Sequence, residues 1–294
     1  MDTDVDDSDR PLVVVHGNCQ AESVRLMMDA PDVTTVRIPP AHELSSSDLP
    51  GLFGLLSRAD VLISQPIRDN YRGLPIGTGQ LASWMPTTST TLLIPVIRFA
   101  GLYPFHLIVR PPHDTSASPP LVAYHDARLL RTAYDRRSDS TARVRRVELS
   151  TDQVLEIGRQ SLAELSTREE RHSTLVVSDV FDAPTFAQMR TINHPGNAVW
   201  SVVSDRIRST LGYHDPPADP GRPLLDSIHA PRLPVVAEAY GLTDPIQDAW
   251  VVDGRSVDTA EVEEAHLEWY HDHPDAVDAG MARHGATLAT LGLG

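Results

Sequence analysis

The chain has 294 residues, of which 41% are hydrophobic, and its formal net charge is −15. This apolar content is enough to bury a large core. The acidic charge argues against a nucleic-acid partner, because phosphate backbones bind through basic patches. All 25 residues counted as lysine or arginine are arginines, which excludes Schiff-base enzymes, P-loop proteins and kinases, since each relies on a lysine amine. With no apolar run of membrane-spanning length and no secretory pattern, we expect a cytoplasmic protein without a membrane span.

The first half of the chain predicts a mostly parallel β-sheet flanked by helices. Apolar runs predict strands at residues 12–16, 34–38, 61–64 and 91–94, and helix-like segments at residues 21–28 and 49–58 lie between them. This alternation is typical of an α/β fold. Each strand ends in Gly, Pro, Asn or Gln. Polar residues therefore gather at the carboxyl edge of the sheet, where ligands bind in open α/β sheets.

The second half is predicted to be more helical. Periodic apolar residues predict helices at residues 150–170 and 198–211, and a short apolar run at 175–177 is consistent with a strand. From residue 258 the pattern predicts two helices broken at Pro274. We therefore expect a mobile acidic tail over residues 1–10, which holds five aspartates, an α/β catalytic domain over residues 11–250, and a helical C-terminal extension over residues 251–294.

The only cysteine, Cys19, lies between the first predicted strand and the helix that follows, in VVVHGNCQAESV. A single cysteine excludes an internal disulfide and a multi-cysteine metal site. At a helix N-terminus, a thiolate is favoured by the helix dipole and by unpaired amide groups. Gly17 permits a tight turn whose backbone amides can hold an oxyanion. The alternative is a small buried cysteine that packs like alanine.

Five segments carry a resemblance to a known family. GNCQ, at residues 17–20, is followed in order by VLISQPIRDNYRG, PVIRFAGLYPF, TINHPGNAVW and PRLPVVAEAYGL. In this order they resemble the WcbI family of capsular-polysaccharide biosynthesis acetyltransferases, over residues 12–243. The resemblance implies a three-layer sandwich similar to that of SGNH hydrolases, binding of coenzyme A, and transfer of an acyl group to a sugar hydroxyl.

The resemblance also implies the catalytic residues. Cys19 takes the place of the serine nucleophile, and His194 of the Asn-His-Pro motif is the candidate general base. A protonated His194 near the thiol would favour the thiolate further. SGNH esterases have an aspartate three residues before the histidine, but Thr191 stands there, and only Asp179 or Asp182 remains to orient the ring from a neighbouring loop.

Further residues are predicted to bind or position the substrate. Gln65, at the end of the third strand, is a candidate oxyanion donor together with the turn residues Asn18 and Gln20, with a structural cap as the alternative. The next loop carries guanidinium groups that can clamp the phosphates of coenzyme A, or are ordinary surface residues. The predicted substrate-binding and cofactor-binding residues are Arg68, Tyr71, Arg72, Tyr103, His106 and Asn193.

Four histidines are expected to have no role in the reaction. His16 ends a predicted buried strand, which favours a core histidine. His266, His271 and His273 lack the spacing of a zinc motif and are interpreted as a solvated helix end, so no metal is expected.

The sequence thus predicts an acyltransferase that moves an acyl group through Cys19 to a hydroxyl or amine of a saccharide or secondary-metabolite acceptor. Coenzyme A or its acyl form is expected as a substrate, with no cofactor bound permanently. A homodimer is left open. A cysteine-dependent hydrolase or thioesterase would use the same residues, and a non-catalytic protein that binds coenzyme A or an acyl carrier is the alternative from another class.

Overall fold

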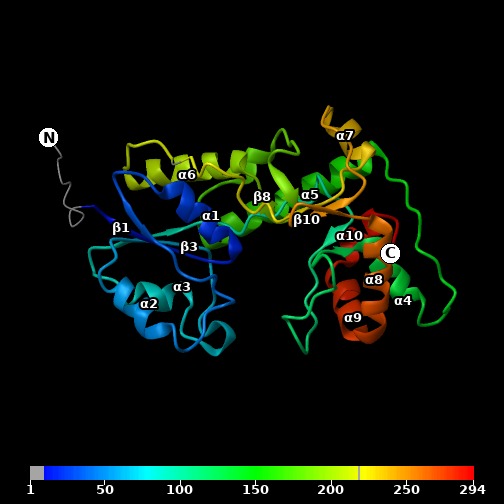
Figure 1. Ribbon diagram of the computed structural model, residues 1–294, viewed down its shortest axis with the longest axis horizontal. Helices are drawn as coiled ribbons and strands as arrows, with labels where there is room; N and C mark the ends of the chain where they lie inside the picture. The colour runs from blue at the N-terminus through cyan, green and yellow to red at the C-terminus, as the bar shows by residue number, and fades with distance from the viewer. Residues whose placement is uncertain (1–9, 218) are drawn as a thin grey trace. The chain divides into compact units, whose positions relative to one another are not determined.

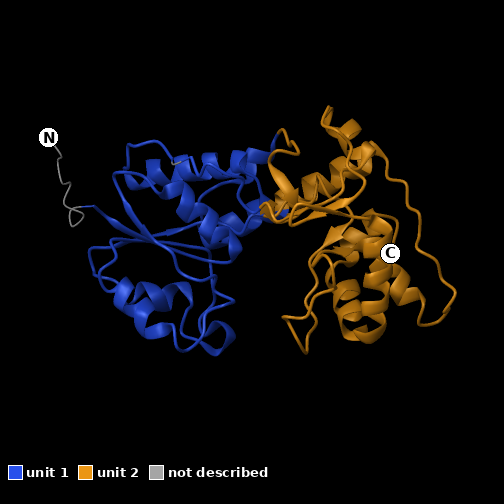
Figure 2. Cartoon of the chain, viewed as in Figure 1, with its two compact units in different colours: residues 1–97, 164–182, 195–225 blue, residues 98–163, 183–194, 226–294 orange. Residues whose placement is uncertain are grey.

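The computed structural model describes residues 10–217 and 219–294 (Figure 1). The tail predicted over residues 1–10 therefore lies, apart from Arg10, outside the described residues. The chain forms two compact units (Figure 2). Unit 1 comprises residues 1–97, 164–182 and 195–225, and unit 2 comprises residues 98–163, 183–194 and 226–294. These units do not follow the boundary predicted at residue 250, because unit 2 contains residues on both sides of it.

Unit 1 is built around a parallel sheet with the strand order β2-β1-β3-β4. The strands are β1 (Leu12–His16), β2 (Thr34–Val36), β3 (Val61–Ser64) and β4 (Thr90–Leu93). All four predicted strands are confirmed, with ends that move by at most two residues. His16 pairs with Ser64 and Ser64 with Leu93. Three strands consequently end level, and the residues that follow them share one edge of the sheet.

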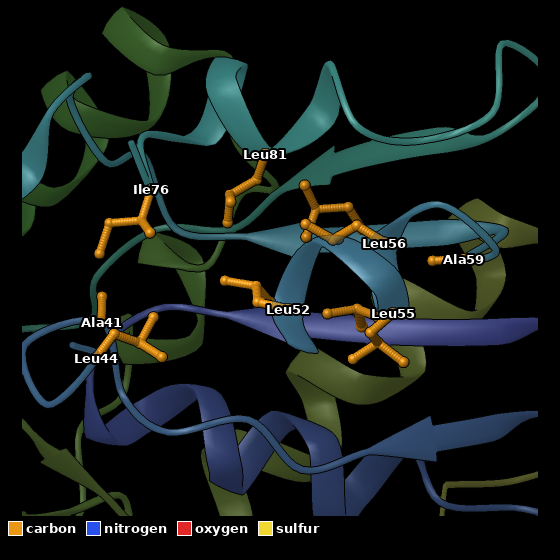
Figure 3. Close-up of a cluster of buried hydrophobic side chains, with 10 residues drawn as sticks. Ala41, Leu44, Leu52, Leu55, Leu56, Ala59, Ile76 and Leu81 are labelled. Atoms are coloured by element: carbon orange, nitrogen blue, oxygen red, sulfur yellow. The ribbon is translucent and has the colours of Figure 1, made fainter. Parts of the chain in front are cut away.

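Helices cover both faces of this sheet, so unit 1 has three layers (Figure 1). On one face, α1 (Cys19–Met28) packs against α6 (Asn197–Leu211), where the Ser204 hydroxyl donates to the carbonyl of Met27 at 3.0 Å. On the other face lie α2 (Leu49–Leu56) and α3 (Thr78–Ala82). Their leucines form a buried cluster with Val14 and Leu62 of the sheet (Figure 3). This burial supplies most of the free energy that holds the layers together.

One predicted element of unit 1 is wrong. Residues 175–177 do not form a strand. Leu175 donates a single backbone hydrogen bond, 2.8 Å long, to Leu93 of β4, and the chain then enters a 3-10 turn at Ser178–Phe181. Glu169 caps this turn, because its carboxylate accepts from the amides of Val177 and Ser178 at 2.7 and 2.9 Å. The cap therefore binds the Val177 amide, which a strand continued from Leu175 would pair with β4.

Unit 2 combines short antiparallel strands with helices. The strand pairs are β5 (His106–Leu107) with β6 (His125–Asp126), β7 (Met189–Thr191) with β8 (His194–Pro195), and the three-stranded order β11-β10-β9. The last sheet comprises β9 (Ile228–His229), β10 (Trp250–Val252) and β11 (Arg255–Val257). Helix α5 (Thr151–His172) contributes residues to both units.

The remaining helices of unit 2 confirm the predicted break at Pro274. They are α4 (Ala127–Asp135), α7 (Pro234–Tyr240), α8 (Thr259–Asp272), α9 (Pro274–Arg283) and α10 (Gly285–Thr290). Pro274 is the first residue of α9, where its missing N–H costs no helical hydrogen bond. No helix among the described residues is long and apolar enough to cross a membrane.

Candidate functional site

Cys19 is the first residue of α1 and follows β1 by a two-residue turn. Asn18 caps the helix, since its side-chain oxygen accepts from the amide of Gln20 at 2.9 Å. The turn thus places a half-buried thiol at the carboxyl edge of the sheet and at the positive end of a ten-residue helix. Both features favour the thiolate form over the thiol. The structure confirms the predicted position of Cys19, between a strand and the helix that follows it.

A buried pair of glutamines holds this turn. Gln65, which follows β3 and is 2% exposed, accepts from the backbone amide of Asn18 at 2.8 Å and donates to the side-chain oxygen of Gln20 at 3.1 Å. Gln20 in turn donates to the carbonyl of Ile97 at 2.8 Å and accepts from its amide at 3.0 Å. Both polar atoms of the Gln65 side-chain amide therefore form hydrogen bonds within the protein. Gln65 and Gln20 thus hold the turn that carries Cys19 by hydrogen bonds, and the oxyanion-donor role of Gln65 stays a prediction.

Gly17 lies directly against Gln65. A Cβ added at Gly17 would lie 2.6 Å from the side-chain oxygen of Gln65 and 2.9 Å from its Cδ. Gln65 has little room to move, because both ends of its amide are hydrogen-bonded. Gly17 is therefore required by a close approach between the turn and the end of β3.

Gly17→Ala is expected to displace Gln65 and lower the free energy of unfolding by about 1–3 kcal/mol, the usual cost of an overpacked site. Gly51→Ala is the matched control, because no atom lies within 4 Å of its added Cβ and Gly51 is on the exposed side of α2. That change is expected to raise stability by about 0.5–1 kcal/mol through helix propensity. Urea unfolding of both variants measures the difference. Equal effects would contradict the role of Gly17.

The loop after β3 carries the predicted phosphate-binding residues. Arg68 and Arg72 are exposed, and neither forms an ion pair with another residue in the described ranges. The loop itself is held in place, since Thr78 bonds both its Ile67 amide and the carbonyl of Gln65, at 3.0 and 2.9 Å. Tyr71 packs against the apolar cluster under the sheet. Its ring therefore has a packing role, and its predicted contact with ligand stays a prediction.

His194 and Asn193 lie in unit 2, next to Tyr124. The Thr191 hydroxyl donates to the Tyr124 hydroxyl at 2.8 Å, which donates to the side-chain oxygen of Asn193 at 2.7 Å. The ring of His194 meets Tyr124 edge to face, with ring centres 5.9 Å apart. This chain of hydroxyl groups holds the Asn-His-Pro segment. Cys19 belongs to unit 1, so its pairing with His194 stays a prediction.

The protonation state of His194 differs from the one expected. The pKa of its imidazole is lowered to about 4, mainly by burial and in smaller part by the nearby charges of Arg190 and His229. The ring is therefore neutral near pH 7. The expectation that a protonated His194 stabilises the thiolate is corrected, because desolvation disfavours the charged ring. A neutral imidazole is nevertheless the form that accepts a proton.

The two aspartates considered as partners of His194 lie in unit 1. Asp179 forms a two-point ion pair with Arg206, at 2.6 and 2.8 Å, and Asp182 is exposed. Asp179 thus has a structural partner of its own. Their predicted action on His194 receives no support.

Tyr103 and His106 line a cavity of unit 2, together with Tyr124 and Trp250. The sequence analysis identified Tyr103 and His106 but not Tyr124 or Trp250. Tyr124 lies in a short segment with no recognisable motif, and Trp250 comes from a strand more than 140 residues beyond His106. Only the tertiary structure brings them together, so no sequence signal could have identified the set.

His16 and His266 are buried in the core. His16 is fully buried, and its Nε2 donates to the Ile76 carbonyl at 3.0 Å, which confirms the core interpretation. His266 is also fully buried and bonds the carbonyl of Val122. The prediction of a solvated helix end is therefore wrong for His266, although His271 is exposed. Over residues 10–217 and 219–294, no three His, Cys, Asp or Glu side chains are grouped so that they could hold a metal ion.

Comparison with known proteins identifies the family. The family model described as polysaccharide biosynthesis enzyme WcbI matches residues 12–216. A solved structure of WcbI has the same fold, with a TM-score of 0.76 and 20% identity over 97% of this chain and 99% of the other. It is described as the native protein without a disulfide bond between coenzyme A and one of its cysteines. No curated protein matches the chain. Because the family model covers more than half of the sequence, this chain belongs to the WcbI family of polysaccharide biosynthesis enzymes.

Proposed function

We propose that this protein is a coenzyme A-dependent acyltransferase in which Cys19 carries the acyl group. The observation that supports it most is the position of Cys19, as the first residue of α1 at the carboxyl edge of a parallel sheet. A thiol there meets the two requirements of a nucleophile, a favoured thiolate and nearby backbone amides for the oxyanion. The acceptor is a hydroxyl or amine of a saccharide or secondary metabolite, and the family's place in polysaccharide biosynthesis favours a saccharide.

The solved relative supports coenzyme A as the acyl donor. Its description names a disulfide bond between coenzyme A and a cysteine as absent from that native protein, and such a bond requires the coenzyme thiol to reach that cysteine. Cys19 is the only residue of this chain able to form such a bond. A coenzyme thiol beside Cys19 is also the arrangement that acyl exchange between two sulfur atoms requires.

The proposed reaction has two steps. The Cys19 thiolate attacks the thioester carbonyl of the acyl-coenzyme A, and the tetrahedral intermediate collapses with departure of the coenzyme A thiolate. A hydroxyl or amine of the acceptor then attacks the acyl group on Cys19. His194 accepts the proton of that nucleophile, and the Cys19 thiolate leaves. An SGNH-like arrangement of these groups is part of the same proposal.

Intact-mass measurement after incubation with acetyl-coenzyme A tests the first step. A mass gain of one acetyl group, mapped to Cys19 by peptide analysis, supports the covalent mechanism. Rapid loss of this acetyl group to water, equally fast with and without acceptor, would favour a hydrolase or thioesterase. Measurable binding of coenzyme A with no mass gain and no turnover would overturn the proposal in favour of a binding protein.

Arg68→Ala combined with Arg72→Ala is expected to weaken coenzyme A binding by about tenfold or more, because hydrogen bonds to a charged phosphate are worth about 1.5–3 kcal/mol. Calorimetric titration with coenzyme A measures the affinity. Arg58→Ala is the matched control, since Arg58 is also exposed but precedes β3, at the opposite end of that strand. Unchanged affinity in the double variant would remove this loop from the site.

A further inference from the structure

A second, smaller cavity of unit 2, here named the basic cavity, has a lining with basic side chains and no acidic ones. Its volume is about 140 Å³, and every residue that lines it belongs to unit 2 (Figure 2). Its basic lining residues are Arg190, His229 and Arg232, and none of the aspartates and glutamates among the described residues lines it. Pockets for drug-sized ligands have volumes of about 300–1,000 Å³. The basic cavity therefore has room for one small anionic group and not for a whole coenzyme.

The basic side chains lie on a fixed backbone. The amide of Ala230, which follows β9, donates to the carbonyl of Arg190 in β7 at 2.9 Å. The amide of Arg232 donates to the carbonyl of Gln247 at 2.6 Å. The guanidinium group of Arg232 also lies over the ring of Phe186, with its Cζ 5.0 Å from the ring centre, which is a cation–π contact. The two arginines are therefore held near each other without a ligand.

Both arginines have N–H groups that other residues do not use. Arg232 makes no side-chain hydrogen bond within residues 10–217 and 219–294, since the carboxylate that it faces, Asp244, lies 3.8 Å from its Nη1. Arg190 donates to Asp226 through Nε alone, at 2.6 Å. Its Nη1 is buried, so Nη2 is the nitrogen open to a ligand. An anion with several oxygens would accept hydrogen bonds from both guanidinium groups.

The charges favour a phosphate over a carboxylate. Two guanidinium groups carry two permanent positive charges, and a phosphate monoester carries a charge of about −1.5 to −2 near pH 7 with three acceptor oxygens. Each nearby carboxylate is more exposed than its arginine, with 43% for Asp226 against 13% for Arg190, and 37% for Asp244 against 24% for Arg232. Water therefore screens the two carboxylates more than the two arginines. The lining keeps a positive potential despite these partners.

We propose that the basic cavity binds one phosphate monoester group through Arg190 and Arg232. The group can belong to a sugar phosphate or to coenzyme A, because the cavity surrounds only the phosphate and the rest of either molecule lies outside it. This binding does not rest on the proposed function, since it requires neither Cys19 nor an acyl group.

Calorimetric titration with glucose 1-phosphate tests the binding, with glucose as the uncharged comparison. Glucose 1-phosphate is expected to bind and glucose is not. Arg232→Gln is expected to weaken the binding by about 10- to 100-fold, because hydrogen bonds to a charged group are lost. Arg131→Gln is the matched control, since Arg131 is 19% exposed in unit 2 and pairs with Asp135, but lies outside the basic cavity. Equal weakening in both variants, or no binding of glucose 1-phosphate at millimolar concentration, would overturn the proposal.

A measurement on the unmodified protein does not depend on the folding of a variant. Phenylglyoxal modifies accessible arginines, and peptide mass analysis gives the rate at each one. Glucose 1-phosphate at about ten times its Kd is expected to slow the modification of Arg232 by about tenfold, because about a tenth of the sites stay free. Arg255, exposed on β11, should react at an unchanged rate. An unchanged rate at Arg232 would contradict the proposal.

Competition identifies the source of the phosphate. Coenzyme A carries a phosphate monoester that dephospho-coenzyme A lacks. Displacement of glucose 1-phosphate by coenzyme A alone would assign the basic cavity to the coenzyme, and displacement by neither would assign it to a sugar phosphate. Equal displacement by both would overturn a site for a monoester. Protein that binds glucose 1-phosphate but is never acylated by acetyl-coenzyme A would contradict only the proposed function, whereas acylated protein that binds no glucose 1-phosphate would contradict only the basic cavity.

Discussion

Replacing Cys19 with alanine is expected to lower kcat for acyl transfer by about three orders of magnitude or more, because no thioester can form without the sulfur. Coenzyme A affinity should stay nearly unchanged, since a nucleophile contributes more to the transition state than to the ground state. Chromatographic measurement of the coenzyme A released from acetyl-coenzyme A, with and without acceptor, gives the rate. Calorimetry gives the affinity.

Two further variants sharpen this experiment. Cys19→Ser nearly keeps the size of the side chain but replaces an ionisable thiol by a hydroxyl. Acylation of this variant should therefore be much slower than that of the unmodified protein. Ser23→Ala changes a buried residue on the next turn of α1 and should leave the rate near that of the unmodified protein. If Cys19→Ala keeps most of its activity, the covalent mechanism is wrong, and His194 must then activate the acceptor for direct attack on bound acyl-coenzyme A.

Replacing His194 with alanine is expected to slow acyl transfer by about two to four orders of magnitude, the usual contribution of a positioned general base. Acylation of Cys19, the first step, should be much less affected, because the ring is neutral and has no positive charge that could stabilise the thiolate. Single-turnover acylation followed by mass, compared with steady-state transfer, separates the two steps. His113→Ala, on an exposed loop, is the control for loss of a histidine. Equal slowing of both steps would contradict a role in the second step alone.

The pH dependence follows from the buried environment of His194. Because burial lowers its pKa to about 4, the imidazole is in the proton-accepting form above that pH. The acidic limb of the kcat profile is therefore expected near pH 4, where the ring becomes protonated, and not near the ordinary histidine value of about 6.5. A limb near 6.5 that disappears in His194→Ala would show that the working site is more hydrated. A limb that is unchanged in this variant belongs to another group.

The elements of unit 1 were predictable because their signals are local. An apolar run of strand length followed by Gly17 and Asn18 determines the end of β1, the turn and the helix cap within a few residues. The same information placed Cys19 at the start of α1. The strand predicted at residues 175–177 was wrong because the side chain of Glu169, at the end of the preceding helix, accepts from the Val177 amide.

The α/β class, the position of the single thiol and the family could be predicted before the fold was known, because strand and helix periods and the order of five motifs are properties of the chain alone. What the polar groups do depends on contacts that form only on folding. Gln65 supports the Cys19 turn, His266 is buried, and the unit 2 cavity joins Tyr103 and His106 to Trp250. Hydrogen-bond partners and desolvation depend on residues far apart in the chain, and these determine which groups are free to act on a substrate.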